Sequence, residues 1–325
     1  MVAPSDLLRL PFTRDLTEGG VAYAVRSLTR GMAARPADPG KIRHLVGSAA
    51  AELAFRRSLG GNDIPFTVAR TLPFTQPDRY DVMVGGHRCE IRTQLITDRR
   101  QIAALQRDPS GLLRGSCSVS RSDLFQSDAA HRDLYVFAFV LALAAASARD
   151  LGRALANGQP CYLLHRMPAS WRSPAVWRPL GPLSLESDTT SPMNVELAGC
   201  DADRNSVSRT VKVQGGSSAQ SGSGLFSVAA LGVRAPLQRN LQIGAAGPHL
   251  RHVVQPQDWS NIWIYGIEII LAGYLSREEF RRRLSSTKTN TPRTHSGAVC
   301  RLPVAALRPL PELLSSVKDW QVRPR

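Results

Sequence analysis

Helical spacing of apolar residues dominates the N-terminal part of the chain. Ala, Val and Leu recur at helical intervals over residues 21–32, and a longer stripe at i, i+3, i+4 and i+7 covers Lys41–Leu59. Asp38-Pro39-Gly40 is a helix-start signal, and Gly60-Gly61-Asn62 is a helix-stop signal. The pattern therefore predicts a short lead-in helix followed by an amphipathic helix over residues 41–59.

The next part of the chain changes to short extended runs. Residues 66–72, 80–84 and 87–95 have the composition and length of strands. Gly85-Gly86 joins the last two runs, and a two-residue glycine loop is typical of a hairpin because glycine adopts positive φ freely. We therefore expect a strand followed by a two-stranded hairpin.

The most apolar stretch runs from Leu134 to Ala148. It is shorter than the ~20 residues that a membrane-spanning helix needs, so no membrane partner is expected. Its first part, residues 133–140, predicts a central buried strand, and its small residues predict a helix that follows. Further strands are expected at residues 159–165 and 261–271.

Composition divides the chain into three segments. Residues 1–39 form a lead-in, residues 40–167 form a core, and residues 168–325 form a C-terminal module of unassigned role that is expected to be α+β or β-rich. Within the module, the Ser- and Gly-rich stretch 214–224 predicts a flexible segment. Ser276–Glu279 has the capping-box spacing that begins a helix.

The charge balance is strongly basic, with 41 Lys and Arg against 26 Asp and Glu and a net charge of +15. Such a surface suits a polyanion, because each neutralised phosphate releases a counterion, and arginine binds phosphate as a fork. An arginine-rich proteome produces the same balance without any nucleic-acid ligand. The five cysteines are dispersed and contain no CxxC pair, which excludes a zinc finger and predicts reduced thiols and a cytoplasmic location.

The predicted hairpin contains residues with the chemistry of a divalent-metal site. Residues i and i+2 of a strand face the same side, so Glu90 and Arg92 project together. Asp81 lies on the partner strand, close enough to share an ion with Glu90, and the carbonyl oxygen of Ile91 is a further candidate ligand. Mg²⁺ or Mn²⁺ takes such oxygen ligands, activates water and screens phosphate charge. These residues therefore predict phosphodiester hydrolysis.

These residues stand in the runs VGSAAAELAFRRSL, RYDVMVGGHRCEIRTQ and DLYVFAF, which together are similar to the PD-(D/E)xK, or restriction-endonuclease-like, superfamily. The resemblance covers about residues 40–165. It implies an α/β fold in which a mixed sheet is flanked by helices. It also implies that Glu52 is the acid of the helix, Asp81 the strand aspartate and Glu90 the acid of the triplet. Arg92 occupies the position where the family usually has lysine.

Arginine at position 92 leaves more than one function open. A guanidinium keeps its proton, so Arg92 can stabilise phosphate charge but cannot act as a base. The first hypothesis is a magnesium-dependent endonuclease acting on DNA in restriction, repair or phage defence, as a homodimer or with a defence-system partner protein; Glu52 then binds a second ion or orients water. The second is a nuclease-fold protein that has lost catalysis and binds nucleic acid or serves as a scaffold. The third is an unrelated protein whose basicity is compositional, in which the three acids lie far apart and Glu90 and Arg92 form an ordinary surface ion pair.

Three runs of consecutive arginines are compatible with either nucleic-acid binding or simple exposure to solvent. Arg56-Arg57, Arg99-Arg100 and Arg281–Arg283 are candidates for contacts to backbone phosphates or for solvated helix faces.

Overall fold

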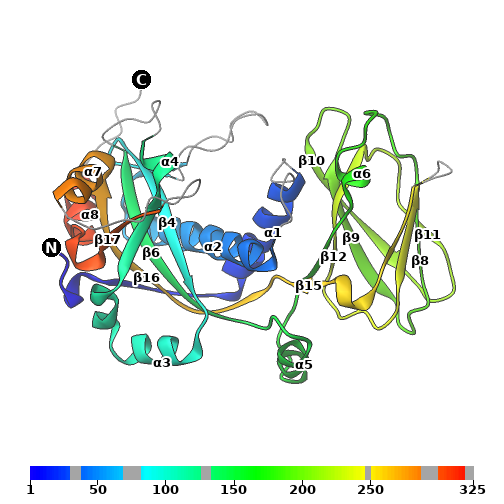
Figure 1. Cartoon of the computed structure of the whole chain (residues 1–325), viewed down its shortest axis with the longest axis horizontal. Coiled ribbons are helices and arrows are strands. Elements are labelled where there is room, and N and C mark those ends of the chain that lie inside the picture. Colours follow the sequence, from blue (N-terminus) through cyan, green and yellow to red (C-terminus); the bar gives the residue numbers. More distant parts are fainter. Residues whose placement is uncertain (30–37, 69–81, 126–132, 246–249, 287–298, 319–325) are drawn as a thin grey trace. The chain divides into compact units, whose positions relative to one another are not determined.

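The computed structural model describes residues 1–29, 38–68, 82–125, 133–245, 250–286 and 299–318. The chain divides into two compact units (Figure 1). Unit 1 comprises Met1–Thr17, Gly47–Leu143 and Tyr265–Arg325, and unit 2 comprises Glu18–Val46 and Ala144–Ile264. Each unit therefore combines segments that are distant in the sequence.

A six-stranded mixed sheet forms the centre of unit 1. Its strands are β1 (Leu8–Pro11), β2 (Phe66–Val68), β3 (Val82–Val84), β4 (His87–Ile96), β6 (Leu134–Ala144) and β16 (Ile264–Ser276). They lie in the order β1-β16-β6-β4-β3-β2. β4 and β6 run parallel, whereas β1 and β16, β2 and β3, and β3 and β4 run antiparallel. Unit 1 is thus a mixed α/β structure whose curled sheet is flanked by helices (Figure 1).

Helices and a small second sheet accompany this mixed sheet. The helices are α2 (Pro39–Gly61), whose second part from Gly47 belongs to unit 1, α3 (Arg99–Arg107), α4 (Arg121–Leu124), α7 (Arg277–Ser286) and α8 (Leu310–Lys318), with short 3-10 helices at Pro4–Asp6, Pro109–Arg114 and Val304–Ala306. Helix α1 (Arg14–Thr29) belongs to unit 2 from Glu18 onward. The small sheet pairs β5 (Ser116–Ser120) with β17 (Val299–Pro303).

Local signals in the sequence locate several of these elements correctly. The predicted amphipathic helix is α2, and the Asp38 carboxylate accepts a 2.8 Å hydrogen bond from the Gly40 N–H at its start. The predicted hairpin joins β3 to β4, with φ values of 55° at Gly85 and 77° at Gly86. At the start of α7, the Ser276 hydroxyl accepts from the Glu279 N–H at 3.1 Å, while the Glu279 carboxylate accepts from the Ser276 N–H at 3.2 Å. The lead-in helix α1 begins at Arg14, seven residues before the predicted start.

β6 is the most completely buried strand of unit 1, as its apolar run predicts. Because side chains alternate between the faces of a strand, its odd-numbered residues share one face. On that face they pack with side chains of α3 and α7 in one hydrophobic core; its members include Tyr135, Phe137, Phe139, Leu141, Ile102, Leu105 and Phe280. This face is the one that positions the candidate site.

Unit 2 is β-rich and is built from two antiparallel sheets. One has the order β10 (Ser206–Val213), β9 (Met193–Cys200), β12 (Ser227–Val233), β7 (Leu163–Arg166), β15 (Ser260–Asn261). The other has the order β11 (Ala219–Gln220), β8 (Leu183–Ser187), β13 (Leu241–Ala245), β14 (Arg251–Val254). Short helices lie at α5 (Ala148–Ala156) and α6 (Ala169–Arg172), with a 3-10 turn at Pro256–Asp258.

The two sheets of unit 2 share one hydrophobic core. Leu197 and Leu231 contribute to it from the first sheet, and Leu185 and Ile243 contribute from the second. The low-complexity stretch 214–224 includes β11, which pairs with β8. The strand predicted at residues 159–165 begins four residues later than expected, at Leu163. Among the described residues, no helix combines the length and the apolar character needed to span a membrane.

Candidate functional site

Glu90 and Arg92 lie side by side on β4, as their i, i+2 spacing predicts. The Arg92 Nη2 atom lies 2.6 Å from a carboxylate oxygen of Glu90. In the parallel register between β4 and β6, Glu90 is opposite Tyr135 and Arg92 is opposite Phe137. β4 is an inner strand with neighbours on both sides, so the sheet holds this pair on a fixed backbone.

A second carboxylate, from outside the predicted hairpin, also binds Arg92. The Arg92 Nη1 atom donates a 2.8 Å hydrogen bond to the carboxylate of Asp123 on α4. The backbone N–H of Asp123 in turn donates to the Ser120 hydroxyl. The side chains are 20% exposed for Arg92, 27% for Glu90 and 41% for Asp123. The guanidinium therefore bridges two carboxylates in a partly desolvated position, where such contacts are stronger than on an open surface.

The ring of Tyr135 is in contact with two guanidinium groups. The guanidinium carbons of Arg92 and Arg277 lie 5.1 and 5.4 Å from the ring centroid, within the range of cation–π attraction. Tyr135 is fully buried. Burial raises the pKa of its hydroxyl, and Glu90 also raises it, while Arg277 and Arg92 act against them. The phenol therefore stays protonated.

The charge of Arg92 is secured by its neighbours. Burial by itself lowers the pKa of Arg92, but Glu90 and Asp123 outweigh that effect and hold the pKa above its ordinary value. Arg92 is thus a permanent cation, as expected for arginine, and cannot accept a proton.

Three arginines of α7 donate hydrogen bonds to backbone carbonyl oxygens of the protein. Arg277 donates to the carbonyl oxygen of Asp123, and Arg281 donates to that of Leu124 at 2.8 Å. These are carbonyls at the C-terminal end of α4, where cations stabilise the unpaired backbone groups of a helix. Arg283 donates to the carbonyl oxygen of Ala306. Two of the three arginines in the run Arg281–Arg283 therefore bind backbone carbonyls of unit 1, and one of these carbonyls belongs to α4.

The other predicted site residues are placed as follows. Glu52 lies on α2 and forms an ion pair with Arg56, one helical turn later. The side chain of Ile91 is 8% exposed and alternates with Glu90 and Arg92, so it belongs to the opposite face of β4. Asp81 lies outside the described residues. The structure therefore brings Glu90 and Arg92 together, and the prediction that Asp81 joins them stays a prediction.

The chemistry of the described donors suits a hard cation, but their number is small. Glu90 and Asp123 offer carboxylate oxygens, the ligand type that Mg²⁺ and Mn²⁺ prefer. Within the described ranges, which leave out Asp81, no three His, Cys, Asp or Glu side chains form a group able to hold a metal ion. These carboxylate oxygens thus suit a divalent ion. A complete set of ligands would need Asp81, or would need Arg92 to move away from the two carboxylates that it now contacts.

Asp123, Tyr135 and Arg277 are the members of the site that the sequence did not identify. Asp123 stands in a polar stretch, Tyr135 inside an apolar strand, and Arg277 next to a capping box. The sequence indicated only that a buried Arg92 needs carboxylates or other hydrogen-bond acceptors to balance its charge. It did not indicate which residues provide them.

Comparison of the chain with family models, with curated proteins and with solved structures gives no match.

Proposed function

We propose that unit 1 is a restriction-endonuclease-like module that hydrolyses phosphodiester bonds, in DNA rather than RNA, with the help of a divalent cation. The observation that carries this proposal is the parallel pairing of β4 with β6, together with the adjacent Glu90 and Arg92 side chains on one face. The order of elements supports it as well. Helix α2, the antiparallel strands β2, β3 and β4, and the buried strand β6 follow the order that the sequence resemblance implies.

In this proposal some residues of the site bind the metal ion and others bind the phosphate. Asp81, Glu90 and the carbonyl oxygen of Ile91 hold a Mg²⁺ or Mn²⁺ ion, and Glu52 orients water or binds a second ion. When bound, the ion supplies an activated water and neutralises charge on the phosphate. Arg92 binds the phosphate oxygens and keeps its proton throughout. The net charge of +15 favours a polyanionic substrate.

One observation favours a second candidate function. The Arg92 guanidinium already forms ion pairs with Glu90 and Asp123, so its charge is paired within the protein. A site in this state suits a nuclease-fold protein that binds nucleic acid or serves as a scaffold without cleaving it. The two candidates share the fold and the positive net charge, and they differ in metal-dependent turnover.

The test is cleavage of plasmid and single-stranded DNA in the presence of Mg²⁺ or Mn²⁺. We expect wild type to cleave, and Asp81→Ala and Glu90→Ala to lose cleavage by about a hundredfold, the upper end of the loss seen when an outer-shell partner of a metal is removed, since each removes a proposed metal ligand. Glu186→Ala, at an exposed position on β8 of unit 2, is the control and should cleave like wild type. Equal cleavage by all four proteins would rule out the proposed site.

Arg92→Lys separates the two candidates. It places an ammonium where the resembled family usually has lysine. If the wild type binds DNA without cutting it and Arg92→Lys cuts, the second candidate holds and the arginine marks the lost activity. If neither protein cuts or binds any DNA or RNA, both candidates are rejected.

A further inference from the structure

Unit 2 contains a hollow between helix α1 and the outer face of its five-stranded sheet. Val195 and Leu197 of β9 point into the core, so Glu196 and Ala198, which alternate with them, lie on the outer face. The hollow has a volume of about 360 Å³, at the lower end of the ~300–1,000 Å³ typical of small-molecule sites. It is therefore large enough for one flat heterocycle.

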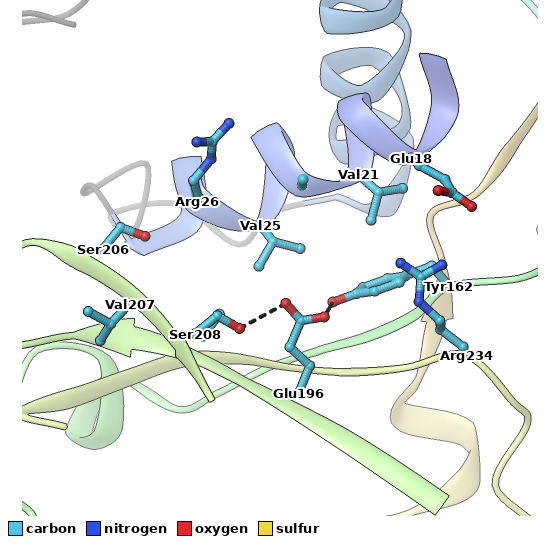
Figure 2. A pocket seen from close by; sticks show the side chains of 12 residues that line it. Glu18, Val21, Val25, Arg26, Tyr162, Glu196, Ser206, Val207, Ser208 and Arg234 are labelled. Atoms are coloured by element: carbon cyan, nitrogen blue, oxygen red, sulfur yellow. Dashed lines mark hydrogen bonds between the residues drawn. The ribbon is translucent and has the colours of Figure 1, made fainter. Parts of the chain in front are cut away.

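The floor of the hollow is a carboxylate whose orientation is fixed. The Tyr162 hydroxyl donates to one oxygen of Glu196 at 2.8 Å, and the Ser208 hydroxyl donates to the other at 2.8 Å (Figure 2). A carboxylate has about four lone-pair sites, so each oxygen can accept a further hydrogen bond. Glu196 can thus receive two parallel hydrogen bonds from a ligand.

A glycine makes this arrangement possible. Gly232 of β12 is opposite Glu196 in the sheet, and a Cβ atom added at Gly232 would lie 2.1 Å from the Tyr162 hydroxyl oxygen. Only a residue without a side chain lets the Tyr162 ring lie across the sheet and reach Glu196. The position of the carboxylate is consequently built into the sheet.

Apolar side chains of α1 face the Glu196 carboxylate, and Glu18, Arg26 and Arg234 also line the hollow. Val21 and Val25 lie on the side of α1 that faces Glu196, whereas the Arg26 guanidinium points away from it (Figure 2). Ala198 adds a small apolar side chain from the sheet. An apolar side that faces a hydrogen-bonding carboxylate suits a flat aromatic ligand that donates from its rim.

A second hollow adjoins the first and shares Tyr162, Glu196 and Arg234 with it. Its volume is about 410 Å³, and Asn194 and Thr210 contribute polar side chains. The Arg234 guanidinium carbon lies 5.5 Å from the centroid of the Tyr162 ring. A ligand whose base occupies the first hollow can therefore extend a sugar and an anionic group towards Arg234.

We propose that unit 2 binds a guanine nucleotide, with the Watson–Crick edge of the base on Glu196. Guanine presents two adjacent donors, N1–H and N2–H, which match the two oxygens of the carboxylate. Adenine and cytosine place an acceptor beside their amino group, and uracil and thymine place a single N–H between two carbonyls. An acceptor facing a carboxylate is repelled, so Glu196 selects guanine among the common bases. This site does not depend on nuclease activity in unit 1.

The test is isothermal titration calorimetry of the full-length chain with guanosine monophosphate. We expect binding of guanosine monophosphate, about tenfold or more weaker binding of inosine monophosphate, which lacks the N2 donors, and weaker binding still of adenosine monophosphate. Equal affinity for the three nucleotides, or binding of none, would overturn the proposal. So would preferential binding of arginine methyl ester, whose guanidinium also offers paired donors.

Variants then locate the site. Glu196→Gln replaces one acceptor oxygen by a donor and should weaken binding of guanosine monophosphate by about 10- to 150-fold. Glu186→Gln makes the same change at an exposed position of the same unit and should bind like wild type. Ala22→Leu narrows the hollow from an exposed position of α1 with another good helix former, so it tests the location even if Glu196→Gln fails to fold. Unchanged binding by Ala22→Leu would place any nucleotide elsewhere.

Discussion

Replacing Arg92 by lysine should loosen the sheet of unit 1 around β4 and β6. The arginine fork reaches Glu90 through one nitrogen at 2.6 Å and Asp123 through another at 2.8 Å. A lysine ammonium is a compact point charge and cannot bridge both carboxylates in the same planar geometry. Arg92→Lys should therefore lose one charge-assisted contact and most of the stacking over Tyr135.

The size of the effect follows from the burial of the partners. A hydrogen bond to a charged group contributes about 1.5–3 kcal/mol when it is buried. Asp123 is 41% exposed, so solvent screening reduces this value, and we expect a loss of about 1–2 kcal/mol in local opening free energy. Exchange of the protected amides in β4 and β6 should accordingly become about 5- to 30-fold faster.

Hydrogen exchange followed by mass spectrometry is the appropriate assay because it reports on each strand separately. Tryptophan fluorescence would report on the other unit, since the tryptophans that the structure describes, Trp171, Trp177, Trp259 and Trp263, all lie in unit 2. Arg100→Lys, at an exposed position on α3, makes the same chemical change and should leave exchange in β4 and β6 unchanged. Unchanged exchange in Arg92→Lys would refute the bridging role of the guanidinium.

Three further predictions concern caps, protonation and close packing. Ser276→Ala should lower the free energy of unfolding of unit 1 by about 1 kcal/mol in calorimetry, because it removes the N-terminal cap of α7. Gly232→Ala should lower the melting temperature of unit 2, because the added methyl group would displace Tyr162. The stability of unit 2 should fall as the pH decreases below about 6.5, because burial lowers the pKa of His165 and of His252, whose Nε2 atoms lie 3.0 Å apart. Because both folded pKa values lie below the unfolded value, the unfolded chain binds more protons than the folded chain at pH values below about 6.5. The urea concentration at the midpoint of unfolding should therefore decrease as the pH is lowered, and it should decrease less in His165→Gln.

Matched controls accompany these three predictions. Ser285→Ala, at an exposed position near the other end of α7, should leave the unfolding free energy of unit 1 nearly unchanged. Gly222→Ala adds a methyl group where no atom lies within 4 Å and should not lower the melting temperature of unit 2. An equal pH dependence in wild type and His165→Gln would show that the histidine pair does not control it.

Features set by neighbouring residues could be predicted from the sequence. Asp38 before Pro39 starts α2, Gly85-Gly86 closes the β3–β4 hairpin, and the spacing of Glu90 and Arg92 puts them on one face. Each depends on backbone geometry or on hydrogen bonds within a few residues. A one-dimensional pattern contains all of that information.

Features set by distant pairing could not be predicted in the same way. β6 is buried on both faces, so its apolar run carries no alternation that would identify its neighbours. Its placement between β4 and β16, and the contact of Asp123 with Arg92, depend on the assembled sheet. The same is true of Tyr162 and Glu196, which meet only because Gly232 leaves room between strands.

The interleaved composition of the units sets an order of events during synthesis. β6 leaves the ribosome early, but its neighbour β16 is encoded after nearly all of unit 2. Unit 2 can therefore fold while the sheet that holds Glu90 and Arg92 still lacks β16 and the α7 arginines that cap α4. A chain released before residue 264 would carry the residues around Glu196 but would lack β16 and α7 beside Glu90 and Arg92. The surroundings of Arg92 are therefore completed only when the last part of the chain has been synthesised.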